Sequence, residues 1–210
     1  MENNNIGRLF IVTAPSGAGK TSLVKALLKL CPQIQISISH TTRYPREDEK
    51  DGVDYFFVNN EIFENLKNNG EFLENAECHG AKYGTAKTPV DSTLKSGKDI
   101  ILEIDYQGAL IVKNIFKEAI SIFIIPPSME ILRKRLVARG QNSTVEINGR
   151  LTAAKEEIRH LEKFDYVIIN ENFDKALDNL KSIYDDSDES KKLVTANQKE
   201  IFQNVINSIK

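Results

Sequence analysis

One short apolar strand, followed at once by a glycine-rich turn and a helix, constrains this chain more than any other feature. Residues 8–13 (RLFIVT) are mostly aliphatic and aromatic, which is typical of a strand buried on both faces. From Lys20 onward, leucines recur at helical spacing until Pro32 ends the pattern. A strand, a glycine turn and a helix in this order predict the opening unit of an α/β fold.

The turn, residues 14–21 (APSGAGKT), matches the phosphate-binding pattern G-x-x-x-x-G-K-[ST] except at its first position, where Ala14 replaces glycine. Backbone N–H groups of such a loop converge on an anion at a helix N-terminus, Lys20 adds a positive charge at the β- and γ-phosphates, and the Thr21 hydroxyl suits Mg²⁺. An ordinary glycine turn is the alternative, but the position between a strand and a helix favours a nucleotide site. The residues expected to contact nucleotide phosphates are Ala14, Pro15, Ser16, Gly17, Ala18, Gly19, Lys20, Thr21 and Ser22.

Later segments extend the α/β pattern. Three further apolar runs, residues 99–104, 120–125 and 166–169, predict parallel strands separated by helices and covered on both faces. Residues 36–90 have a different pattern from these apolar runs, with short strands of alternating polarity (ISIS, DYFFV), a helix at about 61–68 and several glycines. They predict an inserted subdomain with a mixed sheet.

Two helix starts are marked by capping residues. Ser128 is a good N-cap for a helix that runs to Gly140. Ser143 and Glu146 read as a capping box, and the helix after them places an apolar stripe from Ile147 to Leu161 on one face.

Composition excludes several classes of protein. The length of 210 residues fits one compact domain, or one with subdomains. The formal net charge of -2 argues against a general nucleic-acid binder, which would have a basic face. Cys31 and Cys78 form no C-x-x-C pair, so neither a disulfide framework nor a zinc site is expected, and the three histidines lack metal spacing. No apolar stretch approaches the length of a membrane span, and the N-terminus lacks a secretory signal, so we expect a cytoplasmic protein with no membrane partner.

Four further motifs lie in a fixed order along the chain: SISHTTRYPR (37–46), GVDYFF (52–57), EFLE (71–74) and KYGT (82–85). Together with the phosphate loop they closely resemble guanylate kinase. The resemblance continues through EIDYQGA, IIPPS, RLVARG and VIIN, and so extends from Leu9 to about Tyr184. It implies a three-layer α/β phosphate-loop kinase with a mostly parallel central sheet, an inserted mixed α/β subdomain for GMP and a helical lid. The implied reaction is transfer of the γ-phosphoryl group of ATP, with Mg²⁺, to GMP.

The resemblance assigns the acceptor site to one group of side chains. It implies that Arg43, Arg46, Tyr55 and Tyr83 hold the GMP phosphate, and arginine forks with tyrosine hydroxyls suit phosphate oxygens. It assigns guanine recognition to Glu74, because a carboxylate accepts from the neighbouring N1–H and amino group of guanine, a pair that adenine lacks. A plain surface acid is the alternative for Glu74, and a solvated loop is the alternative for the arginines. The remaining substrate residues implied by the resemblance are Ser39, Gly84, Thr85, Glu103 and Asp105.

The same resemblance implies roles for the acids of EIDYQGA, the lid and the last strand. Glu103 departs from the family's usual aspartate on the guanine side, and Asp105 supports either Mg²⁺ or the loop around it through water. Three lid arginines, Arg135, Arg139 and Arg150, neutralise the charge of the moving phosphoryl group, and Lys20 and Arg43 complete the catalytic set. Asn170 borders the adenine of ATP.

The predicted organisation has a core (6–36, 91–127 and 161–184), the GMP subdomain (37–90) and the lid (128–160) within residues 6–184. Residues 185–210 form a polar break and a C-terminal helix. Two other readings stay open: a catalytically inactive module that binds a partner protein in the acceptor cleft, and a kinase of another nucleoside monophosphate. The sequence also leaves open whether the protein is a monomer or a homodimer.

Overall fold

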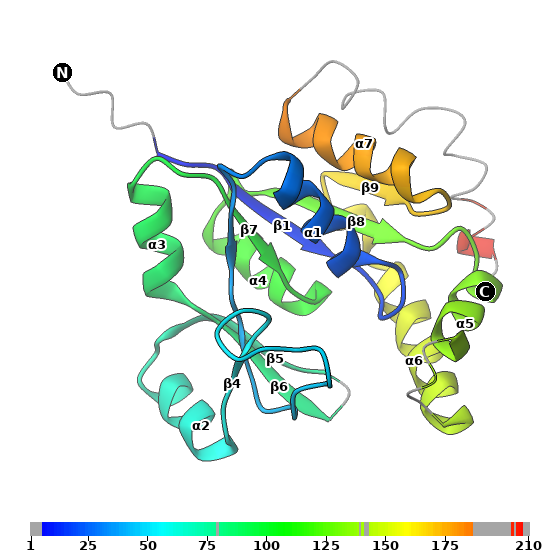
Figure 1. The fold of residues 1–210 in the computed structure, drawn as a ribbon, viewed down its shortest axis with the longest axis horizontal. Helices are drawn as coiled ribbons and strands as arrows, with labels where there is room; N and C mark the ends of the chain where they lie inside the picture. The colour runs from blue at the N-terminus through cyan, green and yellow to red at the C-terminus, as the bar shows by residue number, and fades with distance from the viewer. Residues whose placement is uncertain are drawn as a thin grey trace. The chain divides into compact units, whose positions relative to one another are not determined.

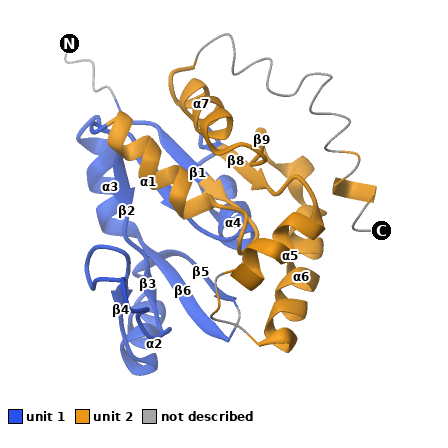
Figure 2. Cartoon of the chain, turned by 45° about the vertical axis from the view of Figure 1, so that its right-hand side comes forward, with its two compact units in different colours: residues 1–11, 32–120 blue, residues 12–31, 121–210 orange. Residues whose placement is uncertain are grey.

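The fold is described from a computed structural model, which covers residues 6–78, 80–138, 140, 143–186, 203 and 205–207. The chain divides into two compact units (Figure 2), and strand β1, Leu9–Thr13, contributes residues to both. Unit 1 comprises residues 1–11 and 32–120, and unit 2 comprises residues 12–31 and 121–210.

Unit 1 contains two kinds of strand pairing. Strand β2 (Gln35–Ser37) runs parallel to β7 (Ile100–Glu103), with Gln35 opposite Ile100. The second sheet has the order β4-β3-β6-β5, with one parallel pair and two antiparallel pairs. Its strands are β3 (His40–Thr41), β4 (Phe56–Phe57), β5 (Phe72–Cys78) and β6 (Ala81–Ala86). The helices of this unit are α2 (Asn60–Asn68), α3 (Lys87–Lys95) and α4 (Tyr106–Ile115). The predicted mixed sheet is therefore confirmed.

Unit 2 holds the helix that follows the glycine turn. Helix α1 (Lys20–Leu30) packs against α7 (Phe173–Tyr184), as Figure 1 shows. Strand β8 (Ile120–Ile125) runs parallel to β9 (Tyr166–Ile169). The other helices are α5 (Met129–Ala138), α6 (Thr144–Ile158) and the 3-10 helix η1 (Leu161–Lys163). The larger sheet has the strand order β2-β7-β1-β8-β9, and the predicted α/β class with a mostly parallel sheet is confirmed.

Capping chemistry sets the ends of several helices. The Ser128 hydroxyl accepts a hydrogen bond from the Ile131 N–H at 3.1 Å, and the capping box of Ser143 and Glu146 is present at the start of α6. Both predicted helix starts are confirmed. Burial of Leu132 and Leu136 of α5 with Ile147 and Ala154 of α6 then joins these two helices.

Two details of the expected strands and helices are wrong. The ISIS segment is not one strand of the inserted subdomain, because Ile36 and Ser37 pair with β7 and only His40 begins the next strand. Helix α6 ends at Ile158, so Leu161 lies in a separate 3-10 turn, although it is buried as expected. The predicted C-terminal break and helix fall largely outside the described residues. Among those described, no helix is both long and apolar enough to span a bilayer.

Candidate functional site

The glycine turn in unit 2 lies directly before α1 and contains two left-handed glycines. Gly17 and Gly19 have φ of 96° and 99°, a left-handed conformation that side chains with a Cβ rarely adopt, and Gly19 is the N-cap of α1. The Ala18 N–H donates to the Pro15 carbonyl at 3.0 Å, and the first turn of α1 carries no acidic residue. Left-handed glycines beside a helix N-terminus create a backbone nest for an anion, and Lys20 is the first residue of the helix.

Ala14, the one departure from the phosphate-loop pattern, has a conformational explanation. Among the residues that the structure describes, Asp186 is the only non-glycine with a positive φ, so Ala14 does not occupy the left-handed region. The loop therefore requires glycine conformations at positions 17 and 19 and tolerates a Cβ at position 14, where the side chain is buried.

Asn170, at the end of β9, links two parts of unit 2. Its buried side-chain amide donates from Nδ2 to the Ala18 carbonyl at 2.7 Å, and its own carbonyl accepts from Arg135 Nη2 at 2.8 Å. A Cβ on Gly19 would lie 2.3 Å from Nδ2, so only glycine allows this approach. Asn170 thus holds the loop and Arg135 together; its contact with adenine stays a prediction.

The predicted lid arginines have different surroundings. Arg135 Nη1 is buried and has no hydrogen-bond partner among the residues that the structure describes, and burial lowers the pKa of this guanidinium from its usual value. An unsatisfied buried donor costs about 1–3 kcal/mol, so the position favours an added acceptor such as a phosphate oxygen. Arg150 Nη1 donates to the Ser16 hydroxyl in the glycine turn at 2.6 Å. Arg139 lies outside the described residues.

A buried carboxylate lies at the centre of the predicted guanine site in unit 1. Glu74 is 4% exposed and accepts at Oε1 from the Thr85 hydroxyl at 2.6 Å, while the Ser39 hydroxyl lies 3.5 Å from that of Thr85. The pairing register between β5 and β6 shifts between Phe72 and Glu74. Phe72, Leu73 and Glu74 are all buried, whereas side chains of a regular strand would alternate between the two faces of the sheet. This irregularity turns the carboxylate inward, which rules out the reading of Glu74 as a surface acid.

Gly108 of α4 makes room for this carboxylate, a role that the sequence analysis missed. A Cβ at Gly108 would lie 2.5 Å from Glu74 Oε2. The Gly108 N–H donates to Asp105 Oδ1 at 2.8 Å, and this bond caps α4. The glycine in EIDYQGA was visible in the sequence, but its partner, 34 positions earlier in the chain, was not.

We expect the substitution Gly108→Ala to raise KM for GMP by about tenfold, because the new methyl group displaces the Glu74 carboxylate while alanine itself suits a helix. Steady-state kinetics with GMP as the varied substrate check this, with Gly149→Ala in α6 as the control, since a Cβ there meets no atom within 4 Å. An unchanged KM for GMP in Gly108→Ala would show that Glu74 tolerates the displacement.

The residues assigned to the GMP phosphate form an aromatic and basic cluster in unit 1. The Arg43 Cζ lies 5.4 Å from the centre of the Tyr55 ring, and the Tyr55 and Tyr83 rings are 6.0 Å apart. Burial, followed by the negative charge of Glu103, raises the pKa of Tyr55 to about 12, so its hydroxyl remains a donor at neutral pH. Arg46 is more exposed, and a salt bridge joins it to Glu49 at 3.6 Å.

Two remaining positions have a structural explanation. A Cβ at Gly84, on β6, would lie 3.0 Å from the Phe72 ring, so this glycine accommodates the phenylalanine. His40 lies between the rings of Phe56 and Phe72, and burial lowers its pKa from the usual value. Within the part of the chain that the structure describes, His, Cys, Asp and Glu side chains form no metal-binding group of three, and His79 lies outside that part.

A family model, sequence relatives and a solved structure all relate this chain to guanylate kinases. A model of the family described as guanylate kinase matches residues 6–187. The chain is 56% identical over 177 residues to a guanylate kinase of Methylobacillus flagellatus, covering 84% of this chain and 88% of the relative. It is 51% identical over 176 residues to one from Coxiella burnetii, covering 84% and 85%. The crystal structure of a guanylate kinase from Anaplasma phagocytophilum superposes with a TM-score of 0.73 at 32% identity and covers 95% of each chain.

The chain belongs to the guanylate kinase family. Membership in this guanylate kinase family implies ATP-dependent phosphoryl transfer. The described residues assigned to ATP and to the lid lie in unit 2, while those assigned to GMP lie in unit 1.

Proposed function

We propose that this chain transfers the γ-phosphoryl group of Mg-ATP to GMP and so forms ADP and GDP. The observation that carries the choice of acceptor is the buried Glu74 carboxylate with its hydroxyl partners Thr85 and Ser39. Guanine offers two adjacent donors to such a carboxylate. Adenine lacks this pair of donors, so a buried carboxylate oxygen that would accept from guanine would gain no hydrogen bond, at a cost of about 1–3 kcal/mol.

We propose that residues 14–22 hold the phosphates of ATP. The left-handed glycines direct backbone N–H groups toward an anion, and Lys20 supplies a point charge at the β- and γ-phosphates. The bond from Asn170 to Ala18 fixes the conformation of the loop before ATP binds, which lowers the entropic cost of binding.

Mg²⁺ fits the oxygen donors that are present. Thr21, at the start of α1 in unit 2, carries a hydroxyl, and Asp105, the N-cap of α4 in unit 1, carries a carboxylate, and we propose each of them as an oxygen ligand. Mg²⁺ keeps several waters and takes few protein ligands when phosphates supply the rest, so no preformed cage is required. When bound, the ion neutralises charge on the phosphates.

Arginines stabilise the transition state in this proposal. Phosphoryl transfer spreads negative charge over the oxygens of the moving group, and cations fixed in advance lower its energy without covalent chemistry. Arg135 brings a guanidinium nitrogen for which the described part of the chain supplies no acceptor, and Arg150 brings a nitrogen that donates to the Ser16 hydroxyl. Arg139 completes the lid set by resemblance, while Arg43, Arg46, Tyr55 and Tyr83 bind the acceptor phosphate.

We assign GMP binding to residues 37–90, the lid to residues 128–160 and the core to the rest of 6–184. A cytoplasmic location, a monomeric or homodimeric state and the role of residues 185–210 stay predictions.

A coupled assay of ADP release from Mg-ATP, with GMP, AMP, CMP and UMP supplied in turn, tests the proposed function. We expect turnover with GMP alone, and we expect Lys20→Ala to abolish it because the β- and γ-phosphates lose their point charge. Turnover with a different nucleotide would contradict the assignment of Glu74. Tight GMP binding without any turnover would indicate the inactive binding module instead.

A further inference from the structure

Glu49 lies in the loop between β3 and β4, and the proposed reaction gives it no role. Its carboxylate is nevertheless surrounded by donors from the arginine segment. Arg43 Nη2 and Nη1 donate to Oε1 and Oε2, both at 2.9 Å, and the Arg46 backbone N–H donates to Oε2 at 2.8 Å. The Glu49 side chain is 15% exposed, which is unusual for an acid in a surface loop.

Glu49 and Arg43 both stay charged although they are partly buried. Burial opposes ionisation of Glu49, but the hydrogen bonds from Arg43 and Arg46 outweigh it and lower the pKa of the carboxyl group. Burial likewise opposes the charge on Arg43, and hydrogen bonds to Glu49 and Tyr83 outweigh it and raise the pKa of the guanidinium. The contact is therefore a forked, charge-assisted pair at neutral pH.

The hydrogen bonds of Arg43 show which of its N–H groups donate to Glu49. Nη1 donates both to Glu49 and to the Tyr44 carbonyl at 2.7 Å, and Nη2 donates once to Glu49. A guanidinium has five N–H groups, so the Nε–H and the second Nη2–H form the edge that Glu49 does not occupy. Arg43 also forms a hydrogen bond with Tyr83, another residue assigned to the GMP phosphate. The rings of Tyr55 and Phe57, 5.4 and 5.8 Å from Arg43 Cζ, restrain the plane of the group.

We propose that Glu49 is a positioning residue, which binds the Nη1 and Nη2 edge of Arg43 so that the adjacent Nε and Nη2 edge is presented to the phosphate of GMP. This inference rests on the proposed function. The aromatic rings set the tilt of the guanidinium, and the carboxylate sets its rotation within the plane. A phosphate binds the presented edge through two parallel N–H bonds, which requires that rotation to be correct in advance.

A simpler interpretation of Glu49 predicts the opposite effect on GMP binding. If Glu49 only competed with the GMP phosphate for Arg43 and Arg46, removal of its charge would strengthen GMP binding. If Glu49 positions Arg43, removal weakens GMP binding even though the site becomes more positive. The sign of the change in KM for GMP therefore separates the two.

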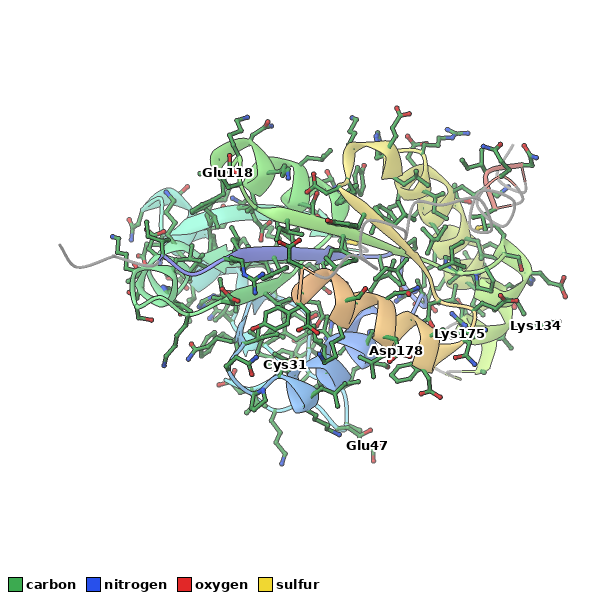
Figure 3. All side chains as sticks on the ribbon, turned by 90° about the horizontal axis from the view of Figure 1, so that it is seen from above. Cys31, Glu47, Glu118, Lys134, Lys175 and Asp178 are labelled. Atoms are coloured by element: carbon green, nitrogen blue, oxygen red, sulfur yellow. The ribbon has the colours of Figure 1, made fainter. Side chains whose placement is uncertain are left out.

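The experiment compares Glu49→Gln, Glu49→Asp and Glu47→Gln with the unmodified chain, with GMP and ATP varied in turn. Glu47, in the same loop, is exposed, and its labelled side chain lies at the periphery in Figure 3. It provides the same change of charge without contact to Arg43. We expect Glu49→Gln to raise KM for GMP about tenfold, with KM for ATP unchanged, and Glu47→Gln to match the unmodified chain.

Glu49→Asp keeps the charge but is one methylene shorter, so it cannot reach both nitrogens of Arg43, and we expect KM for GMP to rise here too. An unchanged or lowered KM for GMP in Glu49→Gln, or unmodified behaviour of Glu49→Asp, would overturn the positioning role. Failure of the unmodified chain to phosphorylate GMP would instead overturn the proposed function, and the role of Glu49 with it.

Discussion

Replacing Glu74 by glutamine should lower kcat/KM for GMP by about 100-fold, since one amide N–H₂ would face the donors of guanine and the negative charge would be lost. Glutamine has nearly the same shape, and its carbonyl oxygen can still accept from the Thr85 hydroxyl, which now bonds Glu74 Oε1 at 2.6 Å. The loss should therefore fall on base recognition rather than on folding. Kinetics with GMP and a thermal melt of the variant measure the two effects separately.

Glu77→Gln is the matched control for Glu74. Glu77 is exposed on the same strand, β5, so the same chemical change there should leave GMP kinetics unaltered. If Glu74→Gln retained the full kcat/KM for GMP, guanine selection would have to come from another part of the chain.

Arg135→Ala should reduce kcat by about 10²- to 10³-fold with a smaller effect on KM for ATP, because a preorganised donor acts mainly on the charge that develops during transfer. The structural reason is the buried Nη1, for which we find no acceptor within the described ranges and which an arriving phosphate oxygen would satisfy. Rapid-quench measurement of a single turnover isolates the chemical step from product release.

Lys134→Ala is the control for Arg135, one position earlier on α5. Lys134 forms only a surface pair with Glu130, and its labelled side chain lies at the outer edge in Figure 3. A loss in Lys134→Ala equal to that in Arg135→Ala would indicate a general effect of positive charge on the lid. An unchanged kcat in Arg135→Ala would remove this arginine from the transition state.

Local chemistry explains which features could be predicted from the sequence. The strand, glycine turn and helix at residues 8–30 depend on neighbours in the chain, as does the capping box at Ser143. Central strands such as β8 are nearly continuous apolar runs, which identifies them without tertiary information. The boundary at ISIS was harder, because a short alternating segment can pair with either of two sheets.

Contacts between distant residues could not be predicted in the same way. The Asn170 amide donates to the Ala18 carbonyl, 152 positions away, and the Arg135 guanidinium donates to a backbone carbonyl, that of Asn170. The space that Gly108 leaves for Glu74 depends on how α4 packs on β5. Spacing in one sequence records which residue types are present, but it does not record which distant partner each will meet.

Calorimetric titration of GMP and of a non-hydrolysable Mg-ATP analogue into Lys20→Ala and Glu74→Gln tests most directly whether the two substrates are held by separate sets of residues. We predict that Lys20→Ala binds GMP like the unmodified chain but loses affinity for the analogue. We predict the reverse for Glu74→Gln. Retention of analogue affinity in Lys20→Ala, or of GMP affinity in Glu74→Gln, would contradict the assignment of ATP to the phosphate loop or of guanine to the buried carboxylate.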